Sequence, residues 1–516
     1  MHFEVLSADN STPGARLGVL SRSSGAATDG TGTPETSSIV TPTWVLPTVR
    51  GSTPGIANTL LERYCLRVAG AGAHATCGRV PVSTGSNEAA QEYDDHSQSS
   101  FCVGVSALDF WNYKGTEEPD GAKFLELNAE KDARHLCSWQ AFPGPLVLSM
   151  RSALALFDML EKDGHPQVVQ FQNRSTRKRL PANEAHRIVA EGLFGDTRGS
   201  RMPVTPERIL DLQQAMRCDL YETLYEVSSW PQPDSSDPAD RDRRDLLEAT
   251  GYALDAGANA HPRIGTVDTL PAERTKQWGT HTLRCAAIRN TPGHALLSVP
   301  ISRSEEFDRG TSRWALELAN AYRDRVAGFN LVGLGNGGAP MLDVLRQCLK
   351  MVQHLRSATS KNLPVFCTGG SAWLVDGSPA IVLGLVSSGV DVLESRYPFV
   401  MAECCYALDL FHESQAADSE ASDPLLYTSV RDPRWAHDAR PILQTCRSAA
   451  SARRCTIGRT YTRAYWYHLF QVNEMLGPML LSLHNIQQYL AFFDEIQDAI
   501  RAHTFASLCE RFQVPV

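Results

Sequence analysis

Short apolar runs rich in β-branched residues alternate with amphipathic segments along much of this chain. Runs of this kind predict buried strands, here at 39–46, 65–69, 168–171, 219–224, 295–299, 329–334, 364–367 and 390–393. Apolar residues at helical spacing predict helices over 206–216, 314–326 and 341–354. The first of these begins with Thr205 and Pro206, a typical helix start. The alternation favours a parallel α/β architecture.

The C-terminal part of the chain has a different pattern. Apolar residues recur at helical spacing from Leu469 to Ile500, which predicts a long helix or a pair of helices. Segments rich in Ser, Thr and Gly at 22–37, 82–100, 228–246 and 414–424 predict loops or insertions. No internal repeat is apparent, which argues against a solenoid or a propeller.

Composition narrows the class of protein. The 516 residues are 42% hydrophobic and 21% charged, as in ordinary soluble proteins, and the net charge of −9 argues against a generally basic, nucleic-acid-coating surface. No apolar stretch is long enough for a membrane-spanning helix, and the N-terminal residues lack a secretory signal pattern. Thirteen scattered cysteines with no C-x-x-C pair predict a reducing, intracellular setting. We expect the cytoplasm, with the nucleus and the mitochondrial surface left open.

Residues 460–485 read TYTRAYWYHLFQVNEMLGPMLLSLHN, and this order resembles the C-terminal signature of the tRNA-guanine transglycosylase family. GARLGVL at 14–20, GFNLVGLGNGG at 328–338 and GLVSSGVDVLESRYP at 384–398 extend the resemblance, which is strongest over 328–505. The resemblance implies an α/β fold: a (β/α)8 TIM-type barrel with insertions and a C-terminal helical segment. In TIM barrels the active site lies at the C-terminal ends of the strands.

The resemblance also sets expected boundaries. Residues 1–430 would form the barrel with its long loop insertions. Residues 431–516 would form a degenerate zinc-type segment and the C-terminal helices, within the same compact unit.

The positions that carry chemistry in the family are altered in this chain. The resemblance places Glu394 where catalytic members have the Asp that attacks the ribose carbon. The additional methylene of Glu moves the carboxylate, and a misplacement of about 1 Å can lower a rate about 100-fold. CSWQAFPGPLVL at 137–148 replaces the segment with the second catalytic Asp, and HALLSVPIS at 294–302 replaces the base-recognition loop.

Four residues are expected to mark the remnant of the family's substrate pocket. Gly333 and Gly335 lie in the Gly-rich pocket loop, and Tyr225, followed by Glu226, stands where the family has a base-reading Asp. The nucleophile is lengthened, and the partner acid and the recognition loop are both missing. We therefore expect no base exchange by this chain alone.

LESRYPFVMAE at 393–403 resembles the accessory subunits of queuine tRNA-ribosyltransferase, which have Glu-Ser where catalytic members have Asp-Cys. The resemblance implies a non-catalytic subunit that pairs with a catalytic homologue in a heterodimer, binds tRNA and supports exchange of guanine for queuine at the wobble position. The C-terminal helices of 463–505 are the candidate dimer surface. Two alternatives stay open: a divergent transglycosylase active alone with Glu394 as nucleophile, and a barrel scaffold without a tRNA role.

A zinc site is implied by the same resemblance, but in degenerate form. The three cysteines that the family has before its C-terminal signature align with Arg453, Cys455 and Gly458, and His484 aligns with the fourth ligand. A structural zinc site needs four ligands, and Cys455 and His484 supply two. His437 and Cys446 lie upstream as further candidate donors.

Clusters of basic residues are the candidate RNA contacts. They are Arg174, Arg177, Lys178 and Arg179 in one run, Arg453 and Arg454 in a second, and the Arg-rich stretch 241–244. Lys and Arg side chains bind phosphates with salt-dependent affinity that carries no sequence information.

Overall fold

The structure is a computed structural model of the chain. It describes residues 1–9, 12, 14–28, 34–48, 52–53, 56–65, 98–107, 132–139, 142–149, 193–197, 200–225, 269–301, 305–334, 341–357, 362–368, 377–411, 426–443 and 454–514. Among these residues, no helix is both long and apolar enough to cross a membrane.

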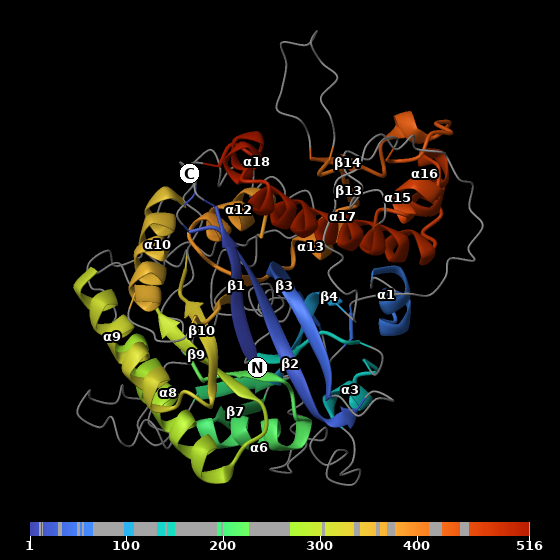
Figure 1. The fold of residues 1–516 in the computed structure, drawn as a ribbon. Helices are drawn as coiled ribbons and strands as arrows, with labels where there is room; N and C mark the ends of the chain where they lie inside the picture. Colours follow the sequence, from blue (N-terminus) through green and yellow to red (C-terminus); the bar gives the residue numbers. More distant parts are fainter. Residues whose placement is uncertain are drawn as a thin grey trace, which may run out of the picture.

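Eight parallel strands close into a barrel (Figure 1). In spatial order they are β3 (Pro34–Pro47), β12 (Val392–Glu394), β11 (Val365–Cys367), β10 (Val326–Val332), β9 (His294–Pro300), β8 (Leu220–Glu222), β5 (Leu146–Ser149) and β4 (Gln98–Ser106). The pairing of β4 with β3 closes the ring, and every pair around it is parallel. The expected TIM-type barrel is therefore confirmed.

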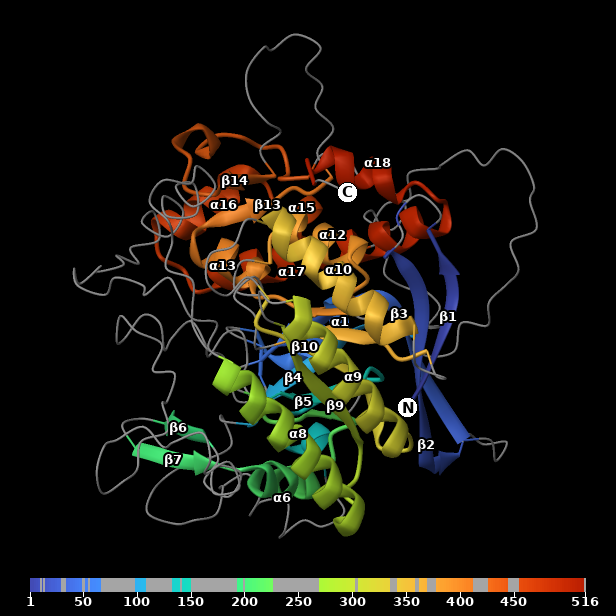
Figure 2. The ribbon, with the colours of Figure 1, turned by 90° about the vertical axis from the view of Figure 1, so that its left-hand side faces the viewer.

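Helices surround the barrel, as expected for strands that are buried on both faces. Those that alternate with its strands are α1 (Asn58–Cys65), α3 (Ala133–Leu136), α6 (Pro206–Met216), α8 (Thr269–Arg289), α9 (Glu305–Ala321), α10 (Met341–Ser357) and α12 (Pro379–Ser387). Figure 2 shows α8, α9 and α10 side by side on the outside of the sheet. A hairpin of β6 (Leu193–Thr197) and β7 (Ser200–Val204) pairs only with itself among the described strands.

The remaining described elements follow the last barrel strand. They are α13 (Tyr397–Glu403), β13 (Tyr406–Leu408), β14 (Tyr427–Ser429), the 3-10 helix η3 (Pro433–Trp435), α15 (Ile457–Thr460), α16 (Arg463–Gln471), α17 (Leu476–Arg501) and α18 (Phe505–Arg511). The sequence pattern from Leu469 to Ile500 corresponds to the pair α16 and α17. Helix α17 packs against α13, β3, β13, α1 and α15, which explains why most of its residues are buried.

The antiparallel strands β1 (His2–Ala8) and β2 (Arg16–Thr28) extend the sheet beside β3. Their apolar residues Phe3 and Leu20 join the core inside the barrel, where each barrel strand contributes at least one side chain. Those inner residues are Ile39, Val45, Cys102, Val147, Leu220, Leu296, Ala327, Phe366 and Val392. The barrel interior is therefore a packed core that the hairpin completes.

Two ion pairs attach β2 to residues at the N-terminal ends of barrel strands. Arg16 makes a bidentate contact of 2.8 and 2.7 Å with Asp391, the residue before β12. Arg22 lies 2.9 Å from Asp219, the residue before β8, and Arg134 lies 2.6 Å from the same carboxylate. Each carboxylate also accepts a backbone N–H from a neighbouring strand, Asp391 from Val365 and Asp219 from Leu146.

Several predicted elements are confirmed and a few are wrong. The helix over 206–216 has the predicted bounds, with Thr205 capping its N-terminus. The predicted strand at 65–69 is wrong at its start, because Cys65 is the last residue of α1, and 168–171 lies outside the described residues. The predicted loop at 22–37 is largely strand, because β2 continues to Thr28 and β3 begins at Pro34. The predicted helix 314–326 ends earlier, since Val326 already belongs to β10.

The buried pair of Arg16 and Asp391 gives the first prediction. Asp391→Asn should lower the free energy of unfolding by about 3–5 kcal/mol, because it leaves the buried Arg16 guanidinium without its counter-charge. Urea unfolding measures the change. The control is Asp211→Asn, which breaks an exposed pair with Arg289 and should lower stability by about 1 kcal/mol or less. Equal effects of the two substitutions would contradict a special role for Asp391.

Candidate functional site

A layer of polar side chains lies inside the barrel. It lies next to the apolar core, toward the C-terminal ends of the strands. Side chains alternate along a strand, so a residue two positions after an inward-facing one also faces inward. Val147, Leu220, Leu296, Phe366 and Val392 are inward-facing core residues. Two positions further on, the same chain segments carry Ser149, Glu222, Ser298, Thr368 and Glu394, all buried. This layer is at the C-terminal ends of the strands, where TIM barrels place their active sites.

Glu222 is the centre of a hydrogen-bond network in this layer. Its Oε1 accepts from Thr368 Oγ1 and from Asn330 Nδ2, the latter at 3.3 Å. The Asn330 carbonyl oxygen in turn accepts the backbone N–H of Thr368 at 3.1 Å. The network ties β8, β10 and the end of β11 together. A carboxylate held in this way is oriented by its donors.

Glu394 ends β12, opposite Val45 of β3, and is 1% exposed. A Cβ added to Gly104 of β4 would lie 3.9 Å from Glu394 Oε1, so this carboxylate lies close to the β4 backbone. The following residue is fixed as well: the Ser395 carbonyl accepts from Trp44 Nε1 at 3.0 Å, and the Ser395 hydroxyl accepts from the backbone N–H of Tyr397 at 3.1 Å. The Glu394 side chain at the position of the family's nucleophile therefore faces into the barrel, and hydrogen bonds fix the residue that follows it.

The segment 137–148, which replaces the family's stretch with the second catalytic acid, is part of the core. Trp139 and Phe142 are 0% and 2% exposed, and their rings meet edge-on with centroids 5.4 Å apart. Phe142 also contacts Phe101 of β4, at 5.1 Å between ring centroids. Residues 137–148 contain no carboxylate. Because Trp139 and Phe142 precede β5, they pack at the N-terminal end of this strand, and its C-terminal end carries Ser149 in the polar layer instead of an acid.

The expected pocket residues are only partly brought together. Gly333 follows β10 with a φ of +92°, a conformation that favours glycine and turns the chain at the barrel mouth. Gly335 and Glu226 lie outside the described residues. Tyr225 is buried in the large core cluster, while the inward-facing carboxylate of this segment is Glu222, three residues earlier. Because Leu220 faces inward, the alternation of side chains along the strand identifies Glu222 as inward-facing. The family resemblance alone indicated Tyr225, three residues later.

Cys455, just before α15, and His484, in α17, are both fully buried, and each has a partner within the protein. Gln488 Nε2 lies 3.0 Å from Cys455 Sγ. His484 Nε2 lies 2.8 Å from the Leu408 carbonyl, so this nitrogen carries the proton and donates. Gly458 packs directly on the imidazole, because a Cβ there would lie 2.6 Å from His484 Nδ1.

These residues do not fit a four-ligand zinc site. The imidazole occupies the space that a side chain at Gly458 would need, which leaves one thiol and one imidazole as donors. Burial lowers the pKa of His484 to about 4, with the Leu408 carbonyl opposing that shift, so the ring is neutral. His437 is exposed, and Cys446 lies outside the described residues. Within the described part of the chain, the one close group of three metal-ligating side chains includes neither Cys455 nor His484.

One expected RNA contact is corrected by the structure. Arg454 is 7% exposed and forms a two-point ion pair with Asp494 of α17, while its Nη1 donates to the Cys65 carbonyl at 3.0 Å. Its charge is therefore committed to joining α17 to α1 and is not presented to a ligand. Arg174, Arg177, Lys178, Arg179 and Arg453 lie outside the described residues, as does the stretch 241–244.

Comparison with known proteins agrees with the architecture. Residues 273–514 match the profile of the family described as Queuine tRNA-ribosyltransferase, a match that includes β9 to β12 and all of the C-terminal helices. This part of the chain, 242 of its 516 residues, is thus similar to that family. The resemblance drawn from residues 460–485 is confirmed at this level.

The most similar relatives include accessory subunits. Queuine tRNA-ribosyltransferase accessory subunit 2 of Aedes aegypti is 26% identical over 200 residues, which is 39% of this chain and 44% of the relative. The protein of that name in Drosophila melanogaster is 29% identical over 183 residues, or 36% and 38% of the two chains. A Queuine tRNA-ribosyltransferase of Dinoroseobacter shibae is 24% identical over 314 residues, or 61% and 65%. The chain thus spans less than half the length of these two accessory relatives.

His484 gives a prediction about pH. Above pH about 6.5 the ring is neutral in both the folded and the unfolded protein, so this side chain adds no pH dependence there. Between pH 6.5 and 4 the unfolded chain binds a proton that the folded chain does not, so stability should fall by up to about 3 kcal/mol as the pH drops. Urea unfolding from pH 4 to 8 should show this loss in the wild type and its absence in His484→Gln. Parallel curves for the two proteins would contradict it.

Proposed function

We propose that this chain is the non-catalytic subunit of a heterodimeric queuine tRNA-ribosyltransferase and supports exchange of guanine for queuine at the tRNA wobble position. The family domain and the accessory names of its relatives support the assignment. The observation that carries the non-catalytic role is at 137–148, where the second catalytic acid would lie. That segment contributes the buried rings of Trp139 and Phe142 and no carboxylate.

The state of the barrel mouth supports the same conclusion. Glu394 keeps a negative charge at the nucleophile position, but an attacking carboxylate also needs a partner acid and a recognition loop in register with it. In the recognition segment, the Ser298 hydroxyl donates to the Thr223 carbonyl at 2.7 Å, so it is engaged within the barrel. Glu222 is likewise committed to Thr368 and Asn330.

Exchange of labelled guanine into tRNA tests the proposal. The purified chain alone should show no exchange, and addition of a catalytic homologue should give activity above that of the homologue alone. Glu394→Gln, which keeps the side-chain shape, should leave the activity of the mixture unchanged. Exchange by the isolated chain that Glu394→Gln abolishes would favour a divergent transglycosylase. Failure to associate with any catalytic homologue would favour a barrel scaffold.

The structure narrows the assembly surface that we propose for the C-terminal helices. Most of α17 is buried within its own chain, so the helix as a whole is not available as an assembly surface. Seven large apolar side chains are exposed among the described residues, and three of them, Val472, Met475 and Leu476, lie at the α16–α17 corner. A fourth, Tyr465, lies in the first turn of α16. Met475 is 78% exposed. Apolar side chains clustered on a surface mark interaction sites more often than scattered ones do.

Substitutions that introduce negative charge at the α16–α17 corner should weaken the proposed heterodimer. Met475→Asp combined with Val472→Asp should reduce affinity for the catalytic homologue at least about tenfold, because a hot-spot side chain contributes about 2 kcal/mol or more and each 1.4 kcal/mol is about tenfold. The matched control is Ile288→Asp on α8, which changes a side chain that is 75% exposed elsewhere. Size-exclusion chromatography and isothermal titration measure association. Equal affinities of the two variants would place the interface away from the corner.

A further inference from the structure

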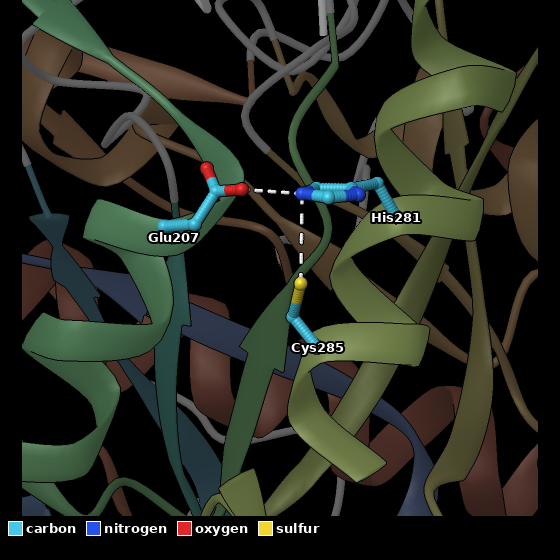
Figure 3. A group of neighbouring side chains, drawn as sticks. All are labelled: Glu207, His281 and Cys285. Atoms are coloured by element: carbon cyan, nitrogen blue, oxygen red, sulfur yellow. Dashed lines mark hydrogen bonds and ion pairs between the residues drawn. The ribbon is translucent and has the colours of Figure 1, made fainter. Parts of the chain in front are cut away.

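Three side chains of metal-ligating type converge between α6 and α8, on the outside of the barrel (Figure 3). Glu207 lies in the first turn of α6, and His281 and Cys285 lie one turn apart on α8. Their ligand atoms all lie within 4.8 Å of one another. Nothing in the proposed function uses this group, because it is remote from the polar layer inside the barrel.

Both neighbours of the imidazole meet the same ring nitrogen. Glu207 Oε1 contacts His281 Nε2, and Cys285 Sγ lies 3.5 Å from that nitrogen. In a catalytic triad, the carboxylate binds one ring nitrogen and the nucleophile binds the other. Burial also raises the pKa of the Cys285 thiol, with Glu207 adding to the shift, which is the opposite of an activated thiolate. The arrangement therefore does not suit nucleophilic catalysis, and it does suit ligands that face a common centre.

The distances suit a tetrahedral ion. With Zn–N of about 2.0 Å and Zn–S of about 2.3 Å, the N–S edge of a tetrahedral site is about 3.5 Å. The observed separation of His281 Nε2 and Cys285 Sγ is 3.5 Å. Glu207 lies closer to the nitrogen than an intervening ion allows, but its side chain is 34% exposed and has room to move outward.

The surroundings support ligand binding. Thr205, the N-cap of α6, hydrogen-bonds the Glu207 side chain, which is how outer residues orient metal ligands. The nearby Arg289 is 2.7 Å from Asp211, so its positive charge is balanced. His281 is 30% exposed and Cys285 is half-buried, which leaves a path for an ion from solvent.

We propose that Glu207, His281 and Cys285 bind one Zn²⁺ ion, with water as fourth ligand, and that the ion clamps the start of α6 to α8. One thiolate, one imidazole and one carboxylate form a donor set of the kind that Zn²⁺ accepts. The site is separate from Cys455 and His484, and it is independent of the proposed accessory role.

Metal binding to the full chain tests the proposal. After treatment with a chelator, the wild-type chain should bind one Zn²⁺ per molecule with a dissociation constant of about 1 μM or below, and Zn²⁺ should raise its melting temperature. With Co²⁺ in place of Zn²⁺, the complex should show the absorption bands of a tetrahedral, thiolate-bound ion. No binding by the wild type would overturn the proposal.

Three variants locate the site. Cys285→Ser should remove the thiolate-to-Co²⁺ band, and Glu207→Gln should weaken Zn²⁺ binding at least about tenfold. Cys455→Ser is the matched control and should leave both readouts unchanged. Circular dichroism of the metal-free proteins verifies that each variant is folded. A Co²⁺ band that persists in Cys285→Ser, or that Cys455→Ser removes, would place the ion elsewhere.

Discussion

Two aspartates at the N-terminal end of the barrel hold the rest of the structure in place. Asp219 and Asp391 each precede a barrel strand, accept the backbone N–H of a neighbouring strand, and bind an arginine of β2. Each is a buried or nearly buried charge whose burial is tolerable only because its partners are complete. The interactions close the end of the barrel that carries no chemistry. Residues at the opposite end can therefore change without loss of the fold.

The C-terminal segment follows the same principle with different groups. Helix α17 carries buried polar side chains that bind the backbone of neighbouring irregular segments. Asn485 accepts from the Leu408 N–H, Gln488 accepts from Leu410, and Gln487 accepts from Ile457. Direct hydrogen bonds thereby hold the chain where the family resemblance implies a zinc ion. A metal is one way to fix such a segment, and a helix with several buried amides is another.

The fold could be predicted from the sequence because its signals are local or repeated. The helix at 206–216 has its own cap and apolar stripe, and short buried apolar segments, Val392-Leu393 and Leu220-Tyr221, precede Glu394 and Glu222. The candidate site was harder to predict from the sequence. The choice of Glu222 over Tyr225 depends on which residues of β8 face inward, and the burial of Arg454 depends on Asp494, forty positions away. Strand β2 reads as a Ser-rich loop because its support comes from pairing with β3 and from the distant Asp219.

The proposed assembly corner lies on the same side of the molecule as the polar layer. Helix α17 runs antiparallel to β3: Tyr489 contacts Trp44, and Gln497, further along the helix, binds the carbonyls of Val40 and Pro42. Its start therefore points past the C-terminal ends of the strands. At a rise of about 1.5 Å per residue, Met475 lies about 20 Å beyond Tyr489 in that direction. A partner bound at this corner, as in the proposed heterodimer, would therefore stand beside the barrel mouth.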